Sequence, residues 1–328
     1  MRRAAFVKNN QQRWKQFEDV VQGRLKVNPD KLAELFIQVT DDLAYSNTQY
    51  PDSDTTTYLN NLASRLHLEI YRNKKEDKTR IITFWTEELP LVLYRTRKPL
   101  LYSLIIFLLA AAIGAVSAAN DETFVRLILS DQYVDMTLEN IEKGEPMGVY
   151  GSMARADMFF AITLNNIMVS FRTFIWGGFL GPMPLFVFLS FGTGFILLQN
   201  GIMLGAFQYF FFTKGLLMES ALIIWLHGTI EISSIIIAGG AGILAGNSLL
   251  FPGTYSRLES FKHGLRDGIK IIIGLVPLFI LAGFIESFVT RLFEMPLILK
   301  VLIILGSLAF VVFYFIIYPR KVYLKHGK

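Results

Sequence analysis

The sequence predicts an all-α protein: a polytopic transmembrane helical bundle of about six spans with a helical N-terminal domain in the cytoplasm. Two observations lead to this prediction. The 328-residue chain is 52% hydrophobic and only 18% charged, whereas soluble proteins average roughly 25% charge. The apolar residues are also segregated, because residues 99–318 consist mostly of apolar runs separated by short polar breaks and residues 1–98 do not. This pattern is typical of a membrane protein with one appended domain.

Residues 1–98 show helical periodicity without any apolar run long enough to cross a membrane. Apolar residues recur every three or four positions in three stretches, which are separated at Asn28-Pro29 and again near Pro51. Three amphipathic helices of this kind can bury a shared apolar stripe as a small bundle. Residues 81–94 mix aromatic, aliphatic and acidic side chains, which favours an interfacial helix at the level of the lipid headgroups.

The first predicted span, 99–119, contains no charged residue and directly follows Arg95, Arg97 and Lys98. The positive-inside rule places this basic flank in the cytoplasm, and the N-terminal domain with it. The next segment, 120–156, is acidic and is expected outside, with an amphipathic helix lying on the outer surface. The remaining spans are predicted at 157–180, 183–212, 217–246, 267–290 and 297–318.

A basic tail at residues 319–328 completes a topology in which the chain is a multi-pass protein of the cell membrane with both termini cytoplasmic. The third span is the least regular. Gly192, Gly194, Gly201 and Gly205 lie in it together with Asn200, so the sequence leaves open whether this helix is broken.

Several classes of function receive no support from the sequence. The chain has no cysteine, which removes disulfides, iron–sulfur ligation and thiolate zinc sites. The motif HGTIE at 227–231 offers one histidine and one carboxylate, fewer ligands than HExxH, so we expect no metal, no cofactor and no catalytic residue. The formal net charge of +5 fits attraction to anionic membrane lipid. Nucleic acid is not expected as a partner, because the N-terminal domain lacks a concentrated basic face.

Polar residues inside the predicted spans are the candidate site, because such residues are costly in a membrane and tend to be functional. His227 and Glu231 lie four residues apart and share one helix face. Arg172 is the expected counter-charge for Glu231. The full set of candidate residues is Asn165, Asn166, Arg172, Asn200, His227, Glu231 and Glu286. These residues form either a structural network or a site for a ligand or a proton.

Ala238, Gly242 and Gly246 recur at four-residue spacing in the fourth span. Small residues at this spacing let two membrane helices approach closely. We expect packing within the chain in preference to a dimer interface, although a homo-oligomer remains open.

The ordered set of polar motifs resembles the stage II sporulation protein M family of bacterial and archaeal integral membrane proteins. The motifs are Asn165-Asn166, Asn200-Gly201 followed by Leu204-Gly205, His227-Gly228-x-x-Glu231-Ile232, and Ile285-Glu286-x-Phe288-Val289-Thr290. The N-terminal run from Asp42 to Arg72 is similar to that of the longer members of the family. The resemblance implies a membrane anchor that works with envelope-acting proteins such as cell-wall hydrolases, or with a MoxR-type ATPase.

Three hypotheses follow. The leading one is a noncatalytic membrane scaffold for envelope or cell-wall processes, in which the buried cluster fixes helix geometry. The second is a transporter, channel or lipid-moving protein that uses Arg172, His227, Glu231 and Glu286. The third is an intramembrane hydrolase in which His227 and Glu231 act as an acid/base pair.

Overall fold

The computed structural model describes residues 2–25, 27–72, 79–144, 155–175, 185–292 and 294–326. Every regular element within these ranges is a helix, so the predicted all-α class is confirmed. The chain divides into two compact units, residues 1–80 and residues 81–328, which are described separately below.

The N-terminal unit contains three helices, α1 (Arg3–Val21), α2 (Pro29–Gln49) and α3 (Asp54–Arg72). The Asn28 side chain caps α2 by accepting a hydrogen bond from the main-chain nitrogen of Lys31. The apolar stripes of the three helices meet in one core, in which Phe17, Val39 and Leu59 are fully buried. Each helix is therefore held by burial of one apolar face, as its periodicity predicts.

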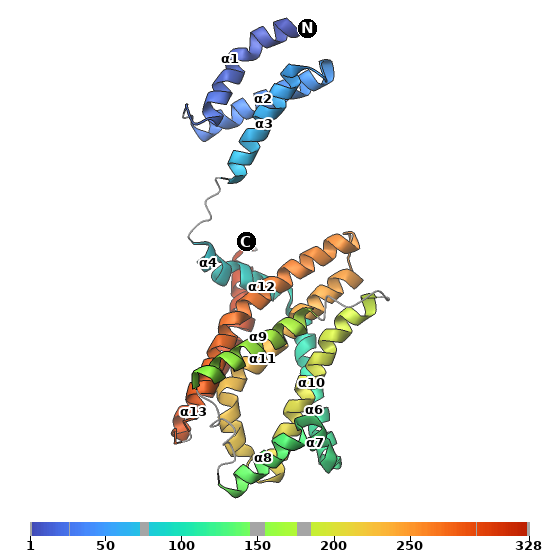
Figure 1. Ribbon diagram of the computed structural model, residues 1–328, viewed down its shortest axis with the longest axis vertical. Coiled ribbons are helices and arrows are strands. Elements are labelled where there is room, and N and C mark those ends of the chain that lie inside the picture. Colours follow the sequence, from blue (N-terminus) through green and yellow to red (C-terminus); the bar gives the residue numbers. More distant parts are fainter. Residues whose placement is uncertain are drawn as a thin grey trace. The chain divides into compact units, whose positions relative to one another are not determined.

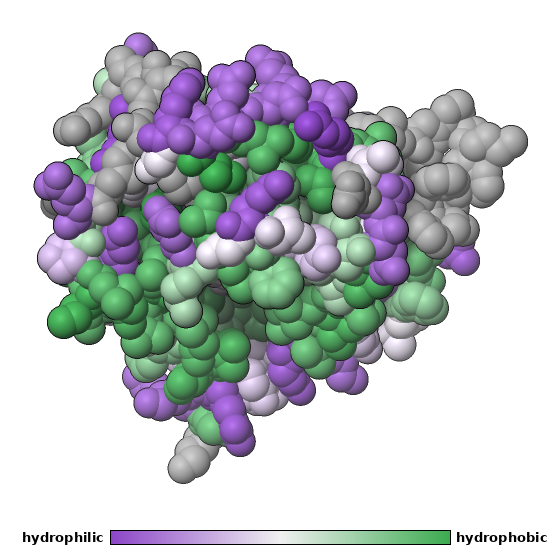
Figure 2. Space-filling view, turned by 90° about the horizontal axis from the view of Figure 1, so that it is seen from below, coloured by the Kyte–Doolittle hydropathy of each residue, from purple (hydrophilic) through white to green (hydrophobic). Residues whose placement is uncertain are grey.

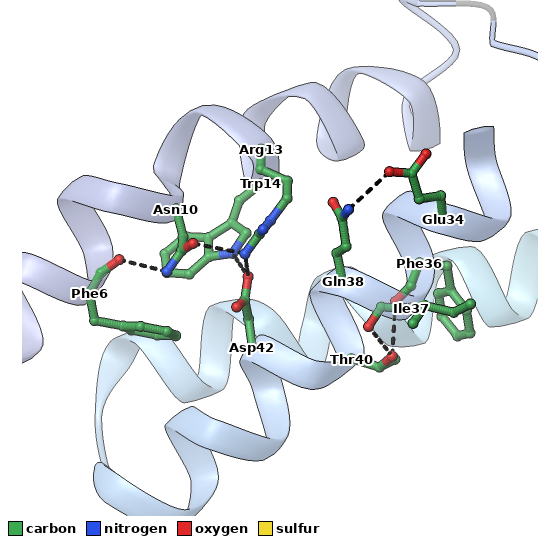
Figure 3. A network of polar contacts seen from close by, with 10 residues as sticks. All are labelled: Phe6, Asn10, Arg13, Trp14, Glu34, Phe36, Ile37, Gln38, Thr40 and Asp42. Atoms are coloured by element: carbon green, nitrogen blue, oxygen red, sulfur yellow. Dashed lines mark hydrogen bonds and ion pairs between the residues drawn. The ribbon is translucent and has the colours of Figure 1, made fainter. Parts of the chain in front are cut away.

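One polar contact joins α1 to α2 inside this unit. An Asp42 carboxylate oxygen accepts a hydrogen bond of 2.8 Å from the indole nitrogen of Trp14 and forms an ion pair with Arg13 (Figure 3). Asp42 and Trp14 are both buried. Since a buried carboxylate needs such partners, this contact fixes how α1 lies on α2.

The second unit begins at residue 81, earlier than the boundary at 98 that the sequence suggested. Its first elements are α4 (Arg80–Thr83), the π-helical segment η1 (Phe84–Glu88) and α5 (Leu89–Arg95). Leu89 and Leu93 of α5 are fully buried in the core of the membrane bundle, and Lys270 of α12 forms an ion pair of 2.8 Å with Glu88. The predicted interfacial segment therefore belongs to the bundle, because its apolar side packs on neighbouring helices.

Six helices are long and apolar enough to cross a membrane, in agreement with the predicted number of spans. They run side by side in Figure 1 and cover Arg97–Asn120, Ala156–Ile175, Gly192–Thr213, Leu217–Leu250, Arg257–Val289 and Leu297–His326. The predicted spans 157–180 and 183–212 meet in residues 176–184, which lie outside the described residues. The corresponding helices are α6 (Arg97–Asn120), α9 (Arg155–Ile175), α10 (Leu185–Thr213), α11 (Leu217–Leu250), α12 (Arg257–Phe284) with η3 (Ile285–Val289), and α13 (Leu297–Val312) continuing through η4 (Phe313–Ile317) into α14 (Tyr318–His326).

The third span is one continuous helix, α10, so the break that its glycines and Asn200 allowed does not occur. Two of those glycines serve packing. A Cβ atom added at Gly205 would lie 1.9 Å from the carbonyl oxygen of Ala111 in α6, and one added at Gly201 would lie 2.5 Å from the Cβ of Ala110. The absence of a side chain thus lets the backbones of α6 and α10 touch.

The small residues of α11 also have neighbours within the chain. Ala238 is fully buried, and a Cβ atom at Gly242 would lie 2.4 Å from the hydroxyl oxygen of Thr193 in α10. Gly246 is buried as well. These contacts give the Ala238–Gly242–Gly246 pattern a packing role inside the bundle.

The acidic segment after α6 forms two short helices, α7 (Glu122–Leu129) and α8 (Asp131–Glu142), where the sequence suggested one. They separate at Ser130, which has a positive φ of 75° and caps α8 by accepting a hydrogen bond from the main-chain nitrogen of Tyr133. Asp121 caps α7, and its hydrogen bonds from the Thr123 hydroxyl and main chain lower the pKa of this carboxyl. Val134 of α8 packs in one apolar cluster with Phe211 of α10.

Candidate functional site

Three titratable side chains meet inside the bundle, from two different helices. His227 and Glu231 lie one turn apart on α11, and Glu286 lies in η3, where α12 changes to a π-helical turn. One ligand-type atom from each of the three lies within 4.8 Å of the other two. We call these three residues the intramembrane cluster.

The His227 ring is oriented by a threonine at the end of η3. Its Nδ1 atom lies 3.2 Å from the Thr290 hydroxyl oxygen, which in turn donates a hydrogen bond of 3.2 Å to the Ile285 carbonyl. Because the hydroxyl hydrogen is used in that bond, Thr290 is placed to accept from Nδ1–H. The Nε2 lone pair then faces Glu286, whose Oε1 atom lies 3.8 Å away.

The π-helical turn explains how Thr290 reaches His227. The main-chain nitrogen of Thr290 bonds to the carbonyl of Ile285, five residues earlier, at 2.8 Å. The wider turn changes which residues face the bundle after Phe284, so that Ser287 and Thr290 are both buried. Single turns of this type occur frequently at functional sites.

A third helix, α9, presents a row of polar side chains to the interior. Thr163, Asn166 and Ser170 are buried at three- and four-residue spacing, and a polar atom of each has no hydrogen-bond partner within the described residues. The Asn166 amide faces the carboxylate of Glu231. Asn166 of α9 therefore borders the cluster, together with residues of α11 and η3.

A cavity of about 320 Å³ reaches the cluster between α6, α7, α8, α10 and α11. His227, Glu231 and Tyr133 of α8 all line this cavity. Burial raises the pKa of this tyrosine. The rest of the lining is mostly apolar: Phe107, Ile128, Leu129, Met203, Leu204, Phe207, Ile224, Ile232 and Ile235, with Asn200 and Gly228.

Figure 2 shows the molecule from below the view of Figure 1, the end at which α7 and α8 lie. Hydrophilic residues gather along part of this face, and hydrophobic residues cover much of the rest. Arg126 of α7 forms ion pairs with the exposed carboxylates of Asp131 and Asp135 on α8. The part of the cavity wall that α7 and α8 form therefore comes from helices with one apolar side and one charged side.

The family model described as Stage II sporulation protein M matches residues 103–291, more than half of the chain. The chain belongs to the stage II sporulation protein M family. The matched range includes the whole intramembrane cluster and every residue that lines the cavity. A second model, described as a domain of unknown function (DUF8413), matches residues 4–72, the three helices of the N-terminal unit. No curated protein and no solved structure matches the chain.

In this member of the stage II sporulation protein M family, the seven predicted site residues do not form one group. Asn166, His227, Glu231 and Glu286 come together as described. Asn165 and Arg172 lie on the exposed side of α9, so the expected ion pair between Arg172 and Glu231 is absent. Arg172 follows Asn166 by six residues, which turns its side chain about 120° away from that of Asn166 around the helix.

Asn200 reaches the cavity but not the cluster. Its amide nitrogen donates a hydrogen bond of 2.8 Å to the carbonyl of Ile196 within α10. Three further buried polar residues, Thr163, Ser170 and Ser287, were not among the residues predicted from the sequence. The spacing of Thr163, Asn166 and Ser170 was a usable signal, because three polar residues on one face of an apolar helix indicate that the face is buried against protein.

Proposed function

We propose that this protein is a noncatalytic membrane scaffold that assembles envelope-acting partners. The observation that carries the proposal is the division into two units: a membrane bundle, and a helical unit at 1–80 with a hydrophobic core of its own. An appended unit of this kind is suited to binding other proteins. Membrane lipid is the remaining partner we propose, because six apolar helices need a bilayer around them.

The geometry of the cluster supports a noncatalytic role. Thr290 faces His227 as a nucleophile would face its base, but it is 2% exposed, donates to the Ile285 carbonyl and does not line the cavity. A substrate carbonyl in the cavity would not reach this hydroxyl. The contacts between His227, Thr290 and Glu286 instead join α11 to η3.

We place both termini in the cytoplasm and α7–α8 outside, from the basic residues before α6 and after η4. The absence of cysteine makes this easy to test by single-cysteine labelling. Glu139 in α8 and Lys15 in α1 are both exposed on the protein surface, so a cysteine at either position is open to a reagent on its own side of the membrane. With a membrane-impermeant maleimide added to intact cells, Glu139→Cys should be labelled and Lys15→Cys should not. The reverse pattern would invert the topology.

The scaffold proposal is tested by crosslinking and mild-detergent copurification from native membranes. Asp131, Asp135 and Glu139 are exposed and form an acidic surface on α8. We expect the wild type to bring down envelope enzymes or a MoxR-type ATPase. Neutralising the three acids to Asn, Asn and Gln should remove outer partners and leave inner ones, while Glu219→Gln, at the start of α11, is the matched control.

A second candidate function is transport, which one observation favours: His227 and Glu231 line a cavity of about 320 Å³ inside the bundle. If the wild type copurifies with no partner while remaining folded, the scaffold proposal fails. Liposome flux of protons and cations then becomes the deciding measurement. Flux that is lost in Glu231→Gln and kept in Glu219→Gln would establish transport.

A further inference from the structure

The intramembrane cluster brings two partly buried carboxylates together inside the bundle. Within the described residues, no lysine or arginine forms an ion pair with Glu231 or Glu286. Arg172, the expected cation, lies on the exposed side of α9. Two neighbouring carboxylates in such a place repel each other unless a proton or a cation lies between them.

The distances favour a cation between the side chains. The 3.8 Å between His227 Nε2 and Glu286 Oε1 is too long for a direct hydrogen bond. Two atoms that ligate one ion at roughly 2.1 Å each lie about 3 to 4 Å apart. The ligand-type atoms of the whole cluster lie within 4.8 Å of one another, so small side-chain rotations would complete such a site.

The groups around the cluster are those that support metal ligands. A ligating histidine usually donates its other ring N–H to an oxygen, and Thr290 is placed to receive it from Nδ1. The Asn166 amide is 5% exposed, has no hydrogen-bond partner of standard geometry for its nitrogen, and faces Glu231. It can hold the carboxylate in the same way that Thr290 holds the imidazole.

We propose that His227 Nε2 and the carboxylates of Glu231 and Glu286 bind one divalent transition-metal ion, for which Zn²⁺ is the best fit. One imidazole and two carboxylates suit Zn²⁺ better than Cu⁺, which prefers sulfur, or Ca²⁺, which takes six to eight oxygens. Two carboxylates and one divalent ion give a neutral group, as burial in a membrane requires. The cavity beside His227 and Glu231 is the entry path. The site goes beyond the proposed scaffold function and does not depend on it.

The experiment measures zinc in the full-length protein purified in detergent, by elemental analysis and by titration of Zn²⁺ into chelator-treated protein. We expect about one Zn²⁺ per chain in the wild type. His227→Ala and Glu286→Gln should lose this zinc. The controls are His263→Ala and Glu219→Gln, which make the same chemical changes at exposed positions and should keep it.

Thr290→Val separates binding from general stability, because it keeps all three ligands and removes the oxygen that faces Nδ1. We expect its Zn²⁺ affinity to fall by about 10- to 100-fold. Chelation should also lower the thermal stability of the wild type reversibly and leave that of Glu286→Gln unchanged, since an ion that binds only the folded state stabilises it. This measurement of thermal stability compares the wild type with a variant of the same side-chain shape, so it does not depend on a variant that fails to fold.

Two results would overturn the proposal. Folded wild type that takes up neither Zn²⁺ nor Mn²⁺ would show that protons alone neutralise the two carboxylates. Equal zinc content in the wild type, His227→Ala and Glu286→Gln would show that the metal binds elsewhere.

Discussion

Gly205→Ala is expected to destabilise the membrane bundle by about 3 kcal/mol, at the upper end of what one added methyl costs in a packed interior. The new Cβ atom would lie 1.9 Å from the carbonyl oxygen of Ala111 and 2.8 Å from the main-chain nitrogen of Ala115. Both atoms belong to the backbone of α6, so no side-chain rotation relieves the contact. The two helices must move apart, and the contacts between them are weakened along their length.

Gly194→Ala is the matched control, because it makes the same change in the same helix at a position where an added Cβ meets no atom within 4 Å. Alanine is up to about 1 kcal/mol better than glycine in a helix interior, so this variant should be neutral or slightly more stable. Unfolding of both variants in detergent by titration with SDS, followed by tryptophan fluorescence, gives the comparison. Equal midpoints for the two variants would show that α6 and α10 do not approach at Gly205.

The glycines of α10 also show what the sequence could and could not predict. Their presence in an apolar run suggested a possible break in the third span, whereas α10 is continuous and its Gly201 and Gly205 contact the backbone of α6. A glycine in a membrane helix permits either a break or a close contact. Choosing between them requires the partner helix, which periodicity does not reveal.

Hydropathy located the spans that hold the candidate site, but it did not predict the direction in which each side chain points around its helix. Whether two side chains meet depends on the rotation of α9 relative to α11, and Arg172 turns out to lie on the exposed side. The pair His227 and Glu231 was predictable because both lie on one helix, four residues apart.

Glu286 and Thr290 illustrate a further limit. Their approach to His227 depends on the π-helical turn of η3, which shifts the register of the residues after Phe284. A regular α-helix was the natural expectation for that span, and it would have turned Thr290 toward a different side. Their inclusion in a family motif was therefore a stronger signal than helical periodicity.

In the N-terminal unit, Asp42→Ala is expected to cost about 2 to 3 kcal/mol, because it leaves a buried indole N–H without its acceptor and Arg13 without its ion pair. The free energy of unfolding of a three-helix unit with one small core is low, so a loss of this size is a large part of it. The adjacent residue Asp41 is exposed, so Asp41→Ala is the matched control and should change stability by less than about 0.5 kcal/mol.

Hydrogen exchange of the full-length protein measures this loss without separating the units. Amides in the middle of α1 and α2 should exchange roughly 30- to 150-fold faster in Asp42→Ala, since each 1.4 kcal/mol corresponds to about a factor of ten. Amides of α11 and α12 should not change, because the two units have separate cores. Faster exchange in both units would instead show that they unfold together, and that the membrane bundle depends on the Asp42 contact.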